Sequence, residues 1–353
     1  MHLNMAGEWI AAGYEVDVVL MRREGALLDL VPEGARVVTL GADRYRNALR
    51  PLVDYLHREK PAVLLAAMWP FTVIAVLAAR LSRVRVRTIV SDHSILSESY
   101  RNRGWLHRVM LRASIAASYR FADERIGVSK GVVADLARLS GIVRDRFRVI
   151  YNPAAVGTTS HEHEELPTEL AGITGPLILT VGTLKAVKDH ASLIDAFARF
   201  PSDLGVTLCI LGEGGLRLDL EQLVSDKGLT GRVLLPGYRA DTKHWYRRAD
   251  LFVLSSHHEG FGNVIVEALE EGVPVVSTDC PGGPREILCD GKYGCLVPVG
   301  DAGALAVAML AALQETPDSE SLKARARDFS VGKIADEYLP VMFPAHRRIR
   351  ISP

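Results

Sequence analysis

The sequence predicts an α/β protein that consists of two doubly wound domains. Short apolar runs alternate with amphipathic, helix-like stretches along the chain, as in parallel sheets whose strands are joined by crossover helices. With 353 residues, the chain is long enough for two domains that each bury a core. A polar, aperiodic segment at residues 157–174 divides the pattern, and we interpret it as the linker between the domains.

Each domain contains six apolar runs of strand length. In the first domain, residues 1–156, strands are predicted at 15–20, 35–40, 62–67, 85–91, 124–128 and 147–150. In the second domain, residues 175–329, they are predicted at 177–181, 206–211, 232–235, 251–254, 273–277 and 294–297. A helix begins near residue 330 and is expected to continue to about residue 345.

The composition, with 48% hydrophobic and 24% charged residues, is typical of a soluble globular protein. No stretch approaches the roughly 18 uncharged apolar residues of a membrane span, and no secretory signal is evident, so we expect a cytoplasmic protein. The four cysteines, Cys209, Cys280, Cys289 and Cys295, lack C-x-x-C spacing. Their spacing favours buried free thiols over disulfides or a metal site.

Charge is divided unevenly between the two halves. Residues 1–156 contain 23 Lys and Arg against 15 Asp and Glu, whereas the remainder contains 19 against 27. A basic first half indicates an anionic membrane or an acidic acceptor, with ordinary surface variation as the alternative. Residues 101–112 interleave arginines with apolar residues at helical spacing, which predicts either a membrane-surface helix with Trp105 at headgroup level or a core-facing helix with a basic solvent face. No nucleic-acid partner is expected.

The most informative run is residues 258–268, which contains two glutamates, Glu259 and Glu267, with seven residues between them. A buried strand is predicted before this run, and a helix that stops at Gly272 is predicted after it. A strand, a glycine turn and a helix N-terminus together present unpaired backbone N–H groups that bind anions such as phosphate. Carboxylates on both sides of such a pocket are placed to bind hydroxyl groups, which is the chemistry of a sugar nucleotide.

This run resembles the E-x7-E signature of the retaining glycosyltransferases of family 4, whose GT-B fold has two Rossmann-like domains facing across a cleft. The resemblance is specific in the second half and also covers Gly182 with Lys188, Gly212-Glu213-Gly214, and residues 235–238, 275–287 and 294–297. It implies an acceptor-binding domain at 1–156, a donor-binding domain at 175–329, and a terminal helix at 330–345 that packs back on the first domain.

The resemblance also implies roles for individual residues of the donor domain. Gly182 and Lys188 would meet the diphosphate, Glu267 the ribose hydroxyls and Glu259 the transferred sugar. Thr183 stands where family members usually have an arginine, so one of the two usual cations is absent. We expect the partners of Glu267 to be ligand hydroxyls rather than core groups.

Further candidates belong to the loops around this pocket. The backbone N–H groups of Phe261, Gly262, Asn263 and Val264 would hold the distal phosphate and the sugar, and Gly260 belongs to the same turn. Tyr238 and Arg239 would cradle the nucleotide base, with packing as the alternative. His93, at the end of a strand in the first domain, would stabilise the developing phosphate charge or hold the acceptor, with a helix-capping loop histidine as the alternative.

The resemblance implies a retaining glycosyltransferase that needs no cofactor and no metal ion. It would move a hexose or N-acetylhexosamine from a nucleotide diphosphate sugar, expected to be a UDP-sugar, to a glycan or lipid-linked acceptor in bacterial polysaccharide or glycoconjugate synthesis. Peripheral contact with the inner face of the cell membrane fits a lipid-linked acceptor. The alternatives are a UDP-sugar epimerase and a non-catalytic protein that binds a sugar nucleotide.

The N-terminus departs from the family pattern. Residues 1–12 resemble the helix that follows the first strand and its glycine-rich loop in family members, and that strand and loop are not found in the sequence. Either the true start lies upstream of Met1, which we expect, or the sheet lacks a central strand. Loss of an inner strand would expose two sheet edges.

Overall fold

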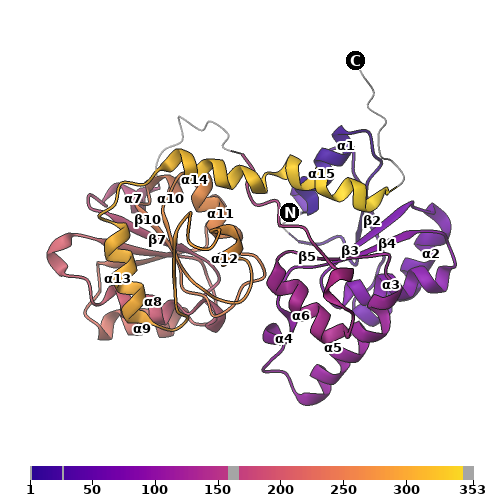
Figure 1. The fold of residues 1–353 in the computed structure, drawn as a ribbon, viewed down its shortest axis with the longest axis horizontal. Helices are drawn as coiled ribbons and strands as arrows, with labels where there is room; N and C mark the ends of the chain where they lie inside the picture. Colours follow the sequence, from indigo (N-terminus) through magenta and orange to yellow (C-terminus); the bar gives the residue numbers. More distant parts are fainter. Residues whose placement is uncertain (1, 26–27, 158–166, 345–353) are drawn as a thin grey trace. The chain divides into compact units, whose positions relative to one another are not determined.

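The computed structural model describes residues 2–25, 28–157 and 167–344, which form two compact units (Figure 1). Unit 1 comprises Met1–Pro153 and Ser330–Pro353, and unit 2 comprises Ala154–Phe329. The chain therefore passes from unit 1 to unit 2 once and returns at Ser330. No helix in the described ranges is both long enough and apolar enough to cross a membrane.

Unit 2 contains a six-stranded parallel sheet in the order β12-β11-β10-β7-β8-β9. The strands are β7 (Leu177–Val181), β8 (Thr207–Leu211), β9 (Val233–Gly237), β10 (Leu251–Leu254), β11 (Val275–Thr278) and β12 (Cys295–Val297). The chain builds one side of β7 and then returns to build the other side, which is the doubly wound arrangement. All six strands predicted for this half are confirmed to within two residues at each end.

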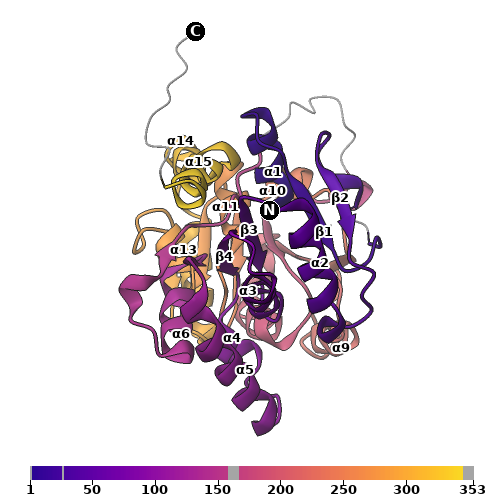
Figure 2. The same ribbon diagram turned by 90° about the vertical axis from the view of Figure 1, so that its right-hand side faces the viewer.

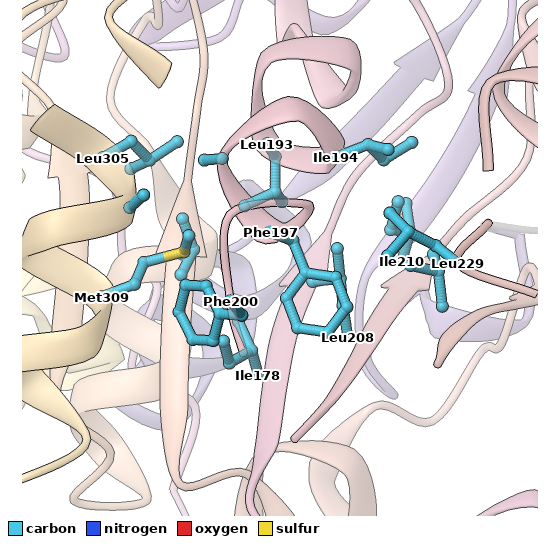
Figure 3. Packing of buried hydrophobic residues seen from close by; sticks show 14 of the residues in the cluster. Ile178, Leu193, Ile194, Phe197, Phe200, Leu208, Ile210, Leu229, Leu305 and Met309 are labelled. Atoms are coloured by element: carbon cyan, nitrogen blue, oxygen red, sulfur yellow. The ribbon is translucent and has the colours of Figure 1, made fainter. Parts of the chain in front are cut away.

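The central strands of unit 2 are buried on both faces, as expected for parallel strands made of continuous apolar runs. All four residues of β10 are buried. On one face, Phe197 and Leu193 pack with Met309 over Ile178 (Figure 3). On the opposite face, the ring of Tyr246 lies 5.6 Å from that of Phe252.

The helices of unit 2 are α7 (Thr168–Ala171), α8 (His190–Phe197), α9 (Arg217–Asp226), α10 (Lys243–Arg248), α11 (Asn263–Glu270), α12 (Pro284–Ile287), α13 (Ala302–Ala312) and α14 (Ser319–Ala326). Helix α7 lies inside the segment predicted as the linker, residues 157–174. Leu170 is buried within unit 2, so its apolar side chain fixes this end of the segment to the folded unit. Residues 158–166 of the predicted linker lie outside the described residues.

The four cysteines are free thiols, as expected. Cys209 and Cys280 are buried, but Cys289 and Cys295 are exposed, so the expectation of burial is wrong for the second pair. Burial raises the pKa of the Cys209 and Cys280 thiols to about 12, so both are protonated and unreactive at neutral pH.

Unit 1 contains two separate parallel sheets, β1-β2 and β3-β4-β5-β6. The strands are β1 (Asp17–Leu20), β2 (Arg36–Thr39), β3 (Val63–Ala67), β4 (Arg87–Asp92), β5 (Glu124–Gly127) and β6 (Arg148–Val149). The helices are α1 (His2–Ala11), α2 (Leu49–Glu59), α3 (Phe71–Ser82), α4 (Leu96–Ser99), α5 (Trp105–Ser118), α6 (Lys130–Ser140) and α15 (Val331–Met342). These strands also lie within two residues of their predicted ends.

The sheet of unit 1 is interrupted between β1 and β3. Val16 packs with Val63 in one apolar cluster, and Val19 packs with Leu64 in another, so the two strands share both cores. Nevertheless, β1 pairs only with β2 and β3 only with β4 among the residues described. All four residues of β1 are only half-buried, whereas an inner strand is normally covered. Among the described residues, β1 and β3 therefore belong to separate sheets that share apolar cores.

Helix α15 packs against α1 within unit 1 (Figure 2). Trp9 donates a hydrogen bond from Nε1 to the carbonyl oxygen of Ala335 at 3.2 Å, and its ring meets that of Tyr338 edge-on. Ile334 and Tyr338 are buried with Ile89 of the central strand β4. The end of the chain therefore completes the core of the unit in which the chain begins.

Candidate functional site

The candidate site lies where the sheet of unit 2 reverses its strand order, between β7 and β10. Leu251 of β10 lies opposite Ile178 of β7, and β7 pairs with β8 on its other side. The loops that follow β7 and β10 therefore begin side by side at the carboxyl edge of the sheet. Open parallel sheets bind their ligands at this kind of switch point.

Hydrogen bonds join these two loops directly. The backbone N–H of His257 donates to the carbonyl oxygen of Val187 at 2.8 Å. The hydroxyl of Ser255 donates to the carbonyl oxygen of Lys188 at 2.7 Å. The turn η5 (Ala186–Lys188) is thus held against the loop after β10 by backbone groups, which fixes the direction in which Lys188 leaves the chain.

Lys188 and Glu259 form an ion pair at the centre of the site. The Nζ of Lys188 donates to Oε1 of Glu259 at 2.6 Å, and the hydroxyl of Ser256 donates to the same oxygen at 2.7 Å. The side chains of Lys188 and Glu259 are only 18% and 12% exposed. Because the pair is largely shielded from solvent, salt screens it less than a surface pair.

Two glycines shape the backbone around this ion pair. A Cβ on Gly282 would lie 1.9 Å from the carbonyl oxygen of Glu259, so the backbone after β11 packs against the loop after β10 without room for a side chain. The backbone N–H of Glu259 donates to the carbonyl oxygen of Pro281 across the same contact, at 3.0 Å. Gly262 has a φ of 102°, in the left-handed region that favours glycine, and it turns the chain into α11.

Helix α11 begins at Asn263 with Gly262 as its N-cap residue and no side-chain cap. Its first turn therefore presents backbone N–H groups at the carboxyl edge of the sheet, where the positive end of the helix dipole favours an anion. The ring of Phe261 is buried and meets the ring of Phe329 edge-on. Phe261 is thus held by its side chain, which leaves its backbone as the part that could face a ligand.

Glu267 has a protein partner that the sequence did not reveal. The hydroxyl of Tyr246 in α10 donates to Oε2 of Glu267 at 2.8 Å. Burial raises the pKa of the Glu267 carboxyl, and the hydrogen bond from Tyr246 acts in the opposite direction. The expectation that Glu267 meets only ligand hydroxyls is therefore wrong, because one carboxylate oxygen is already oriented by a buried tyrosine. A buried tyrosine hydroxyl needs a partner, but no spacing rule identifies it in the sequence.

Other predicted donor-site residues lie at different places on this edge. Gly182 follows β7 directly, and a Cβ there would contact the side chain of Lys188 at 3.4 Å, so the two residues are adjacent. Thr183 is exposed in the next turn position. Tyr238 and Arg239 follow β9, two strands from β7 and hence roughly 10 Å along the sheet. Tyr238 is 70% exposed, whereas Arg239 forms an ion pair with Glu169 of α7.

His93 lies in unit 1 directly after β4. Its Nδ1 lies 3.1 Å from Oδ1 of Asn152, and its Nε2 lies 3.2 Å from the hydroxyl of Ser91, which in turn lies 3.3 Å from the hydroxyl of Tyr338. Burial lowers the pKa of His93 to about 4, so the ring is neutral at physiological pH. Without a ligand, His93 is therefore a neutral hydrogen-bonding group.

The arrangement in unit 2 suits a phosphorylated ligand with hydroxyl groups. A lysine and a helix N-terminus provide the positive groups, and carboxylates on both sides of the helix start can accept hydroxyl hydrogen bonds. No cluster of three or more histidine, cysteine or acidic side chains arranged to hold a metal ion is found in the part of the chain that the structure describes.

Comparisons with known proteins place the chain in a family. Residues 2–156 match the family described as Glycosyltransferase Family 4, and residues 164–329 match Glycosyl transferases group 1. Over 267 residues the chain is 30% identical to N-acetylgalactosamine-N,N'-diacetylbacillosaminyl-diphospho-undecaprenol 4-alpha-N-acetylgalactosaminyltransferase of Campylobacter jejuni, covering 74% of this chain and 71% of that protein.

The chain belongs to glycosyltransferase family 4. This family 4 chain is also 37% identical over 172 residues to the lipopolysaccharide core biosynthesis glycosyltransferase LpsE of Rhizobium meliloti. That match covers 47% of this chain and 49% of LpsE, so the chain spans about half the length of this relative.

Solved structures confirm the predicted fold class. Crystal structures of HepE from Anabaena, in complex with UDP and with UDP-glucose, match the family 4 chain with TM-scores of 0.78 and 0.80 at 24% and 23% identity. The matches cover 97% of this chain and 96% and 94% of those chains. The architecture is thus that of the GT-B glycosyltransferases, with parallel α/β sheets in both units.

Proposed function

We propose that the chain transfers a sugar from a nucleotide diphosphate sugar to an acceptor hydroxyl with retention of anomeric configuration. The observation that carries this proposal is the largely shielded Lys188–Glu259 pair, whose glutamate lies three residues before the N-cap Gly262 of α11. A diphosphate bound at the start of α11 would lie within reach of both the lysine and the helix N–H groups. Family membership and this geometry support the same donor class.

The charge of the leaving diphosphate is met by the protein itself in this proposal, without a metal ion. Lys188 would donate to the diphosphate as well as to Glu259. Glu259 would thus hold the ammonium group of Lys188 near the N-terminus of α11. Preorganised donors of this kind stabilise charge that develops in a transition state, because they do not have to reorient during the reaction. Glu267 would hold the ribose through the oxygen that Tyr246 does not occupy.

The proposed donor is a UDP-sugar, and the proposed acceptor is a glycan or a lipid-linked saccharide. The donor assignment is supported by HepE, a structural neighbour crystallised with UDP and UDP-glucose. The acceptor assignment is supported by the Campylobacter jejuni relative, whose name specifies a diphospho-undecaprenol acceptor. A lipid-linked acceptor would bring the chain to the cytoplasmic face of a membrane, as a peripheral protein.

A ligand screen followed by product analysis tests this proposal. Thermal shifts are measured with UDP-, GDP- and ADP-sugars; a UDP-sugar at ~100 times its dissociation constant should stabilise the folded chain by about 2.7 kcal/mol. The donor that binds is then incubated with candidate acceptors, and the anomeric configuration of the product is read by NMR. Transfer with retention is expected.

Three outcomes would contradict the proposal. Conversion of the UDP-sugar to a different UDP-sugar without acceptor would identify an epimerase. Stabilisation by a sugar nucleotide without turnover on any acceptor, together with no slow hydrolysis, would identify a binding protein. An inverted product would exclude the retaining assignment.

A further inference from the structure

Helix α5 presents an apolar face to solvent. Its buried residues, Leu111, Ile115 and Ser118, repeat at helical spacing and fix the side that packs on unit 1. The opposite side carries two i, i+4 pairs of large apolar residues, all of them exposed. These are Trp105 (70% exposed), Leu106 (57%), Val109 (53%) and Met110 (58%). A surface helix normally directs polar side chains outward, so this face indicates a partner.

The same segment carries a concentrated positive charge. Residues 99–122 include five arginines and no aspartate or glutamate. Arg103, Arg108 and Arg112 are exposed and have no acidic partner among the residues that the structure describes. Arg101 is the exception, since it lies 3.7 Å from Glu98 in an exposed pair. The apolar face therefore has a cationic border that unit 1 does not neutralise.

The position of α5 leaves this face accessible within unit 1. In Figures 1 and 2, α5 projects from the lower edge of the unit, away from β3 and β4. Its contacts are with the neighbouring helices α3 and α6 and the turn after it. The solvent side of α5 therefore carries large apolar side chains beside its arginines.

We propose that α5 docks unit 1 on a lipid bilayer that contains anionic headgroups. Trp105, Leu106, Val109 and Met110 would enter the interface between headgroups and acyl chains, and Arg103, Arg108 and Arg112 would pair with lipid phosphates. Charge complementarity selects this occupant over a second copy of the chain, which would bring the same five arginines against each other. A lipid-linked acceptor would lie in the same bilayer, and in this respect the inference rests on the proposed function.

Vesicle sedimentation with the full chain tests the proposal. The chain is mixed with vesicles of phosphatidylcholine alone or with about one third phosphatidylglycerol, and the bound fraction is measured as salt rises from about 0.05 to 0.5 M. Binding is expected only with phosphatidylglycerol and should weaken with salt. The triple variant Arg103→Gln, Arg108→Gln, Arg112→Gln should bind about a hundredfold more weakly, since each surface cation contributes roughly a factor of five.

Matched variants separate position from composition. Arg44, Arg46 and Arg50 are exposed arginines elsewhere in unit 1, and their change to glutamine removes the same net charge but should leave binding nearly unchanged. In the apolar pair, Trp105→Ser with Met110→Ser should reduce binding about tenfold or more. The control pair, Leu218→Ser with Val307→Ser, alters side chains that are 77% and 70% exposed in unit 2 and should have no effect.

Three results would overturn the proposal. These are absence of binding to anionic vesicles at low salt, equal binding of the α5 variants and their controls, and concentration-dependent self-association that the α5 variants abolish without any vesicle binding. UDP affinity, measured on the same variants by calorimetry, should be unchanged. Loss of vesicle binding with intact UDP binding thus separates failure of this inference from failure of the proposed function.

Discussion

The change Tyr246→Phe removes one buried hydroxyl and should shift the pH dependence of donor binding. Tyr246 is 1% exposed, and its hydroxyl hydrogen bond to Glu267 stabilises the ionised carboxylate. A hydrogen bond to a charged group contributes roughly 1.5 to 3 kcal/mol, and about 1.4 kcal/mol corresponds to one pKa unit. The pKa of Glu267, already raised by burial, should therefore rise by about one to two further units in the variant.

The direction of the effect on binding follows from which form of Glu267 accepts hydrogen bonds. In the proposed binding mode, the carboxylate accepts hydrogen bonds from both ribose hydroxyls, whereas the protonated acid loses part of this capacity. Affinity for UDP should thus fall as the pH decreases through the pKa of Glu267. In Tyr246→Phe the same decrease should occur about one to two pH units higher, with nearly equal affinities at high pH.

Calorimetric titration of UDP at several pH values measures this shift. Tyr338→Phe is the matched control, because Tyr338 is equally buried and its hydroxyl lies near Ser91 in unit 1. A UDP analogue without ribose hydroxyls should bind wild type and Tyr246→Phe with the same pH dependence. A uniform loss of affinity at every pH, or an unchanged profile, would refute the argument that Tyr246 tunes Glu267.

Three further predictions concern charge. Lys188→Ala should weaken binding of UDP far more than binding of uridine, by roughly 1.5 to 3 kcal/mol, and equal losses in calorimetry would mean that the lysine is structural. Removal of divalent cations by a chelator should leave transfer intact in a radiolabelled-sugar assay, and a strict magnesium requirement would contradict the site. Burial raises the pKa of Asp92 to about 7, so the folded state binds the Asp92 proton more tightly than the unfolded state does. The free energy of unfolding of the wild type should therefore decrease as pH rises through this pKa. Asp92→Asn should not show this loss, so its free energy of unfolding minus that of the wild type should increase by about 2 to 3 kcal/mol from pH 5 to pH 8. Urea unfolding measures both values, and a difference that does not depend on pH would count against the prediction.

The strands and the donor motif could be predicted from the sequence because local signals dominate them. The run that forms β10 is continuously apolar, and burial on both faces of a parallel sheet requires this. Gly262 and Glu267 belong to one short segment, so their positions on a turn and a helix follow from chain order. The exact contact of Glu259 with Lys188 depends on strand order, since it joins residues 71 positions apart.

The features that the sequence did not resolve depend on tertiary contacts. Tyr246 and Glu267 lie on different helices, and no periodicity connects them. The segment at α5 was ambiguous because helical spacing defines two faces but does not say which one the protein covers. The burial of Leu170, inside the predicted linker, was not predictable for a similar reason, since a single apolar residue in a polar segment gives no pattern. His93 had a recognisable position, but its neutral state depends on burial.

A structure of the whole chain with bound UDP would test the central claim most directly. We expect the diphosphate to accept hydrogen bonds from Lys188 and from N–H groups at the start of α11, with both ribose hydroxyls directed at Glu267. In the same complex, Tyr246 should still donate to the other oxygen of that carboxylate. UDP bound elsewhere on unit 2, or bound in this pocket with its ribose away from Glu267, would contradict the assignment of this site.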